Sequence, residues 1–284
     1  MGTEVHTIRG PRRDSFDVIC AGEPRWRAAK NPRGPAGLAL SAGLLNIARL
    51  LSTGQVHVGL ATVFEDDHLA RSSLAEIAAL GMDVGGVKLV PRVDTQLIVA
   101  DVAGGESFAF SETGVTQDLE IPAPWSSQVL LLSGLSAITS RLAAFCKAAR
   151  KARRHGTAVV LDLVGSLRHW AGRDPRVISM VLREADVVRC SFLDLATIGM
   201  DSATVRLAMR SNATLVINDH GGTTAVGTFG EVRVKAPRES ISAERLAERC
   251  TAAICAELAR PHGVAETPSG RWHRILKSCA SPPE

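Results

Sequence analysis

Short apolar runs that end in glycine or a polar residue alternate with longer segments of helical periodicity over most of this chain. The runs predicted to be buried strands are 16–22, 56–60, 129–132, 158–163, 186–190 and 215–217. The segments predicted to be helices are 38–51, 66–80, 138–154, 175–184, 193–198, 202–209 and 242–259. Strands that alternate with helices predict an α/β fold with a doubly wound, mostly parallel sheet.

The region 86–111 breaks this rhythm. It contains three short strand-like pieces, 87–90, 95–102 and 106–111, and Gly104-Gly105 between the last two is typical of a hairpin turn. We therefore expect residues 86–111 to form a small antiparallel flap on the sheet edge. The Pro- and Gly-rich segment before residue 37 is short, so the flap is expected to be reduced.

Length and composition indicate one folded unit. The chain has 284 residues, of which 45% are hydrophobic and 22% charged, as in ordinary globular proteins. We expect a single α/β domain over 16–264, with loose termini at 1–15 and 265–284. In a parallel sheet of this kind, ligands bind at the carboxyl ends of the strands.

Cysteine usage and the terminal sequence favour a cytoplasmic protein without a membrane span. The uncharged, largely apolar run 34–47 is too short to cross a bilayer. The first residues lack the apolar core of a signal peptide. The six cysteines match no zinc-ligand spacing, so free, buried thiols in a reducing compartment are expected, with disulfides as the alternative.

The charge balance gives little support to nucleic acid as a partner. Thirty-three basic against 29 acidic residues leave a net charge of +4, which is mild. The basic residues between 147 and 154 could contact nucleic acid, but a solvated helix face is the favoured interpretation.

Several common motifs fail. No GxGxxG follows the first strand. The segment 81–88 is similar to a phosphate-binding P-loop, but Val87 occupies the position that requires lysine. The sequence also contains no GxSxG, HExxH or EF-hand loop.

The order of strand-end segments resembles the PfkB/ribokinase family of sugar and nucleoside kinases. The similar segments are 16–23, 34–43, 64–87, 129–135, 155–170 and 185–199. The most specific block, around 64–87, is similar to the family's GDDxxG segment and the helix that follows it. The resemblance covers roughly 16–264, and it implies a ribokinase-like fold, ATP and Mg²⁺ as cofactors, and a sugar or nucleoside as the small-molecule partner.

Four residues fall at positions where the resemblance implies a ligand contact. Asp162 is the surviving acid of the family's DxNxR segment and would contact substrate, or it caps the next turn. Ser191 and Asp194 replace the Asn and Glu of NxxE and would contact Mg²⁺ or phosphate, although an N-cap role is favoured. Gly222 belongs to the turn 219–224, which is either a backbone nest for an anion or a plain hairpin turn.

The largest departure from the family lies before the last predicted helix. The family signature Asp-Thr-x-Gly-Ala-Gly-Asp opens a helix whose amides bind the transferred phosphate, and its last aspartate is the base. Here residues 234–241 lead into helix 242–259, which we interpret as the family's closing helix, and no GAGD occurs. The glycine–asparagine loop is also altered: Ala39 takes the asparagine position, with Asn46 as the alternative.

These departures predict a degenerate member of the family, with no catalytic residue assigned and a sugar-binding, nucleotide-binding or regulatory role. Two alternatives stay open. One is an active kinase whose base has moved to Asp219 or Glu239, and the other is an interaction protein. The cofactor is unassigned beyond the ATP and Mg²⁺ of the resemblance, and a homo-oligomer is left open.

Overall fold

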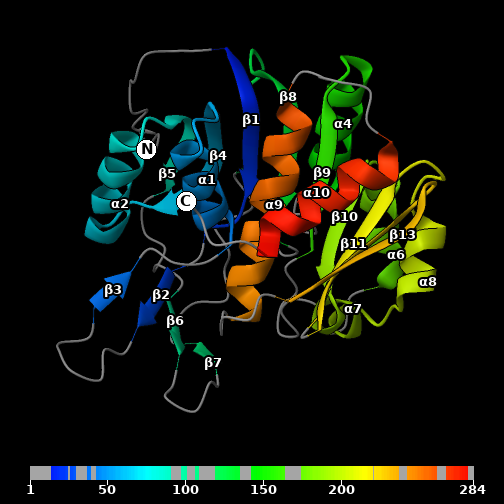
Figure 1. The fold of residues 1–284 in the computed structure, drawn as a ribbon. Coiled ribbons are helices and arrows are strands. Elements are labelled where there is room, and N and C mark those ends of the chain that lie inside the picture. Colours follow the sequence, from blue (N-terminus) through cyan, green and yellow to red (C-terminus); the bar gives the residue numbers. More distant parts are fainter. Residues whose placement is uncertain are drawn as a thin grey trace.

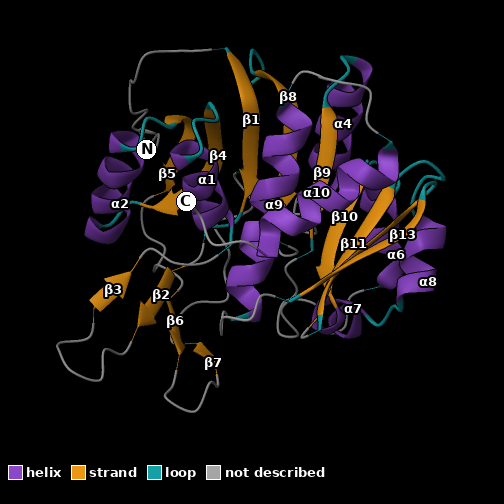
Figure 2. Cartoon of the chain, in the orientation of Figure 1, coloured by secondary structure: helices purple, strands orange, loops and turns teal. Residues whose placement is uncertain are grey.

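A computed structural model gives the architecture of the chain (Figures 1 and 2). It describes residues 14–24, 26–29, 37–39, 43–90, 97–100, 106–108, 119–134, 142–163, 174–219, 221–236, 242–260 and 267–280.

A nine-stranded sheet forms the centre of the molecule, with the strand order β13-β12-β11-β10-β9-β8-β1-β4-β5. The strands from β5 to β11 in this order are parallel, and β12 and β13 add an antiparallel edge. Their bounds are β1 Ser15–Gly22, β4 Val58–Glu65, β5 Asp83–Val90, β8 Ser126–Ser133, β9 Ala158–Asp162, β10 Val187–Ser191, β11 Thr214–Asp219, β12 Gly222–Gly227 and β13 Gly230–Lys235.

Helices cover both faces of this sheet (Figure 2). One face packs against α1 (Leu44–Thr53), α2 (His68–Ala79), α9 (Ala243–Ala259) and α10 (Pro268–Ala280). The other packs against α4 (Leu142–Arg154), α6 (Pro175–Leu182), α7 (Phe192–Ile198) and α8 (Ser202–Ala208). Side chains of successive strand residues alternate between the faces, so Val18 and Cys20 join the first core while Ile19 and Ala21 join the second. The doubly wound α/β prediction is confirmed.

The flap differs from its prediction. A separate four-stranded sheet has the order β3-β2-β6-β7, formed by β2 Trp26–Ala29, β3 Gly37–Ala39, β6 Leu97–Ala100 and β7 Glu106–Phe108. Strand β2 lies where the sequence suggested a loop, and β3 overlaps the start of the predicted helix 38–51. Conversely, residues 87–90 belong to β5, which pairs in parallel with β4 in the central sheet. Their apolar side chains can thus be buried in the main core.

The carboxyl-terminal segment also differs from its prediction. Instead of a loose tail, Pro268–Ala280 forms α10, which packs against α9 and β13 (Figure 1). Trp272, Ile275, Leu276 and Cys279 lie three or four positions apart on one buried helix face. Helix α9 is therefore followed by another packed helix and is not the closing one. Of the expected loose N-terminus, only Asp14 and Ser15 lie within the described residues.

Helix α1 begins later than the periodicity predicted. It starts at Leu44, after Gly43 with φ of 63°, a backbone region that glycine enters without strain. All six cysteines are free and buried, as expected. Among the described residues, no helix is long and apolar enough to cross a membrane.

Candidate functional site

Polar side chains gather where the central parallel strands end. The last residues of four neighbouring strands are Ser133 of β8, Asp162 of β9, Ser191 of β10 and Asp219 of β11. Parallel strands place their carboxyl ends at one edge of the sheet. This edge is therefore the candidate site, and helix α9 packs against the strands β8, β9, β10 and β11 (Figure 1).

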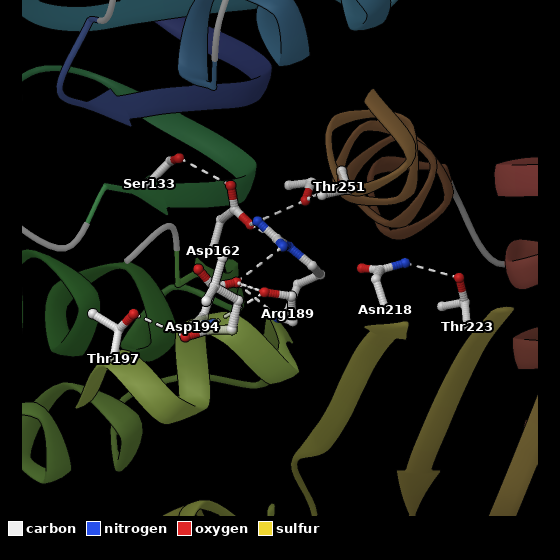
Figure 3. Close-up of polar contacts among 11 residues, drawn as sticks. Ser133, Asp162, Arg189, Asp194, Thr197, Asn218, Thr223 and Thr251 are labelled. Carbon is white, nitrogen blue, oxygen red and sulfur yellow. Dashed lines mark hydrogen bonds and ion pairs between the residues drawn. The ribbon is translucent and has the colours of Figure 1, made fainter. Parts of the chain in front are cut away.

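Asp162 is fully buried and accepts hydrogen bonds from three directions (Figure 3). The Ser133 hydroxyl on the neighbouring strand donates to Oδ2 at 3.0 Å, and the Thr251 hydroxyl of α9 donates to Oδ1 at 3.2 Å. The Arg189 guanidinium forms an ion pair with the same carboxylate. Asp162 thus lies at the strand end the sequence predicted, but its oxygens are used inside the protein.

Arg189 is the buried cation of this edge. It pairs with Asp162 and, through Nη1 at 3.5 Å, with Asp194 of α7. We call Asp162, Arg189 and Asp194 the Arg189 cluster. The two carboxylates raise the pKa of Arg189 against the effect of burial, while burial raises the pKa of Asp162 and Arg189 opposes that rise. Sequence reasoning missed Arg189 because a single arginine in a strand carries no motif.

Ser191 and Asp194 form a capping box at the start of α7. The Asp194 amide donates to Ser191 Oγ at 3.0 Å, and the Ser191 amide donates to Asp194 Oδ2 at 2.7 Å. This is the N-cap interpretation that the sequence favoured. The Asp194 carboxylate is thus bound by the Ser191 amide and by Arg189. The oxygens of Ser191 and Asp194 are used within the protein and are poorly placed to bind Mg²⁺.

Gly222 opens β12 and has a structural reason to be glycine. Its φ is 145°, and a Cβ there would lie 2.1 Å from the Val234 carbonyl oxygen of β13. In the preceding turn, the Asp219 carboxylate accepts from the Gly221 amide at 2.6 Å and pairs with Arg233 at 3.1 Å. The Asp219 carboxylate therefore accepts the Gly221 amide that an anion would need, and its negative charge repels an anion. This agrees with the interpretation as a plain hairpin turn.

A further buried carboxylate, Glu248 of α9, faces helix α1. Its Oε1 accepts from the Gly43 amide at 2.7 Å, and the Asn46 side-chain amide lies 3.1 Å from both carboxylate oxygens. Burial raises the pKa of Glu248 to about 7, while the bonds from Gly43 and Asn46 oppose the rise. The structure thus gives Asn46, the alternative asparagine of the sequence analysis, a buried partner.

The N-terminal turns of α9 leave little room for an anion at Glu248. The helix begins at Ala243 after the Ser242 cap, whose Oγ accepts from the Arg245 amide at 3.2 Å. The Leu246 amide already donates to the Ser242 carbonyl. From there on, backbone amides are committed within the helix. Glu248 therefore lies a full turn beyond the exposed amides that could bind phosphate.

A groove of about 340 Å³ opens on the opposite face of the sheet from α9. Its floor includes Leu215 and Ile217 of β11, and its rim includes Phe192, Arg206 and Arg233. Three charged side chains that line it have partners within the protein: Asp219 pairs with Arg233, and Arg206 donates to two backbone carbonyls. Among the described residues, no group of three or more His, Cys, Asp or Glu side chains could hold a metal ion.

Together, the strand order, the four-stranded flap and the strand-end edge define a ribokinase-like fold, as the resemblance implied. The chain matches no protein-family profile and no curated protein in sequence.

Solved structures of sugar and nucleoside kinases share this fold. Aminoimidazole riboside kinase from Salmonella enterica, complexed with aminoimidazole riboside and an ATP analog, has a TM-score of 0.76 and 16% identity over 93% of this chain and 90% of its own. A PfkB protein from Polaromonas sp. has a TM-score of 0.71 and 19% identity over 93% and 95%. Fructokinase from Xylella fastidiosa with bound ATP has a TM-score of 0.70 and 15% identity over 93% and 91%. At these identities the likeness establishes the fold.

Proposed function

We propose that this chain is a ribokinase-fold protein that binds a sugar or nucleoside and does not transfer phosphate from ATP at the rate of a complete family member. The observation that carries the proposal is the start of α9. The resemblance implies that glycine amides at a helix start bind the transferred phosphate and that the catalytic aspartate lies beside them. Here α9 begins at Ala243 without glycine, and its buried glutamate, Glu248, lies more than one turn further along the helix. Phosphoryl transfer relies on positioning and electrostatic stabilisation, and both depend on those amides.

The Arg189 cluster supports the same proposal. A kinase site needs acids that can meet a metal ion or a substrate hydroxyl. Here Arg189 forms ion pairs with Asp162 and Asp194 within the protein, and the Ser133 and Thr251 hydroxyls donate hydrogen bonds to Asp162. The positive charge beside these two carboxylates is thus the Arg189 guanidinium. ATP and Mg²⁺ fit the described residues poorly, because Ser191 and Asp194 are committed to the α7 cap.

Binding of a sugar or nucleoside rests on the fold and on the flap. The flap strands β2, β3, β6 and β7 are retained, and the solved relatives named above include a riboside kinase with its riboside. We therefore assign the small-molecule site to the space between the flap and the strand ends. The resemblance also suggests the cytoplasm as the place of this activity.

Glu248 favours a second candidate, an active kinase with a relocated base. A carboxyl group with a pKa of about 7 is well matched to accept a hydroxyl proton near neutral pH. The other proposed bases are weaker. Asp219 is held by Arg233 and the Gly221 amide, and Glu239 lies outside the described residues.

Calorimetry and a turnover assay separate these candidates. The purified chain is titrated with ribose, fructose, adenosine and uridine, with and without ATP–Mg²⁺, and ADP formation is followed with each compound. We expect binding heat from at least one compound and no substrate-dependent ADP formation. ADP formation that Glu248→Gln abolishes would instead establish the second candidate. If no compound binds and no ADP forms, the result would favour the remaining alternative, an interaction protein.

The matched control is Glu120→Gln. The Glu120 side chain is exposed and pairs with Lys88 on the far edge strand β5. The variant removes one exposed carboxylate beside β5, which is four strands from β9 in the sheet order. It should therefore leave both binding and turnover unchanged.

A further inference from the structure

Strand β13 ends the nine-stranded sheet, and its outer side carries backbone groups that point away from β12. In the part of the chain that the structure describes, no strand pairs with that outer side. An open sheet edge is a ready template for another strand. The side chains of Glu231, Arg233 and Lys235 are exposed. Those of Val232 and Val234 are partly buried on the face of the sheet that α10 covers.

The register with β12 identifies which backbone groups are available. The Ala236 amide donates to the Gly221 carbonyl, so residue 236 directs its hydrogen bonds toward β12. Along an antiparallel pair, these directions alternate residue by residue. The N–H and C=O groups of residues 231, 233 and 235 therefore point to the open edge.

The side-chain charges along this edge are self-complementary. Two copies of β13 that pair antiparallel about Arg233 place residue 231 of each copy opposite residue 235 of the other. This register sets glutamate against lysine twice, and it uses every outward-pointing backbone group of the strand. The central arginines face each other, but each is already paired with Asp219 of its own copy.

We propose that this chain forms a homodimer in which the β13 strands of two copies pair antiparallel about Arg233 and continue the sheet. The two-fold axis stands perpendicular to the sheet, so the α7–α8 faces of both copies lie on the same side. The groove that Glu231 and Arg233 line in each copy then borders the interface. This proposal is independent of the proposed ligand and of any kinase activity.

Charge reversal tests the register. Analytical ultracentrifugation over a concentration series gives the dimer dissociation constant of the full chain. Glu231→Lys or Lys235→Glu alone creates two like-charged cross-strand pairs and should weaken the dimer about tenfold or more. The double variant with both reversals restores opposite charges in the same register and should return close to the wild-type constant.

Proline tests the backbone pairing. Arg233→Pro removes an outward N–H and leaves the bonds to β12 intact, a change that edge strands tolerate. We expect this variant to be monomeric, whereas Arg233→Ala, which keeps the N–H, should still dimerise. Thermal unfolding checks that each variant is folded. If the proline variant is unfolded, the charge-reversal variants alone test whether the β13 strands pair. A wild-type chain that stays monomeric, or a dimer that no β13 substitution weakens, would overturn the proposal.

Discussion

Two buried carboxylate sites at the same end of the sheet are held in opposite ways. In the Arg189 cluster, a guanidinium lies between Asp162 and Asp194, so the buried negative charges have a positive partner. Among the described residues, the donors to Glu248 are neutral: the Gly43 amide and the Asn46 side chain. Burial is the main cause of the raised pKa in both Asp162 and Glu248, but within the described part of the chain only Asp162 has a cation beside it.

This difference teaches which group at the edge can still change its charge. A carboxylate that is paired and hydrogen-bonded inside a protein is fixed as part of the fold, and removing its partner is costly. A carboxyl group with a pKa near neutral pH gains and loses a proton under ordinary conditions. The carboxylates of the Arg189 cluster are therefore held in ion pairs. Glu248 is the carboxyl group of this pair of sites whose pKa lies near neutral pH.

Removing the cation should give the largest effect on stability. Arg189→Met leaves Asp162 and Asp194 buried without their cation, and we expect a loss of roughly 3–5 kcal/mol in the free energy of unfolding. Urea unfolding at neutral pH measures it.

The double variant Asp162→Asn with Arg189→Met is the matched control. The asparagine oxygen can still accept from one of the two hydroxyls, Ser133 or Thr251, and the side chain carries no charge. The double variant should therefore be more stable than Arg189→Met alone. Equal stabilities of the two variants would contradict the electrostatic role of Arg189.

Glu248 should make stability depend on pH in a known direction. Its pKa rises from 4.5 to about 7 on folding, so the folded state keeps the proton at pH values where the unfolded chain has released it. The wild type should therefore lose on the order of 3 kcal/mol of stability as pH rises from about 4.5 to 7. This loss is relative to Glu248→Gln, which cannot titrate, and urea unfolding at several pH values measures both proteins.

Glu120→Gln provides the control for this titration. Because Glu120 is exposed and pairs with Lys88 of β5, the variant should keep the wild-type pH dependence. If the wild type and Glu248→Gln instead share one pH dependence between pH 5 and 8, Glu248 does not hold a raised pKa.

The sequence predicted the central sheet well because each buried strand is a local signal. Alternation within 16–22 and 158–163 already determines which side chains reach each face of the sheet. The last long helix was predicted to begin at Ser242, one residue before its observed start, and Ser242 caps α9. The favoured N-cap interpretation of Ser191 and Asp194 could likewise be made from spacing alone, since a capping box involves residues only three positions apart.

The remaining features depend on contacts between distant segments. Glu248 looks like a solvated helix residue until Gly43, 205 positions away along the chain, is brought beside it. Arg189 gains its partner only when β9 and β10 pair. The flap strands β2 and β3 have four and three residues, too few for a clear periodicity. Helix α10 did carry a signal, the spacing of Trp272, Ile275, Leu276 and Cys279, but the Pro- and Arg-rich composition obscured it.

The smallest expected effect concerns Ser191, and it distinguishes a cap from a ligand contact. Ser191→Ala removes the hydroxyl that accepts from the Asp194 amide, which should cost about 1 kcal/mol of stability. Ser191→Thr keeps a hydroxyl and should recover most of that loss. If Ser191 acts only through the cap, both variants should bind the sugar or nucleoside found by calorimetry as tightly as the wild type. A drop in affinity for Ser191→Ala that exceeds its loss of stability would mean that the hydroxyl contacts the ligand, and that the arrangement at the start of α7 serves both the fold and the site.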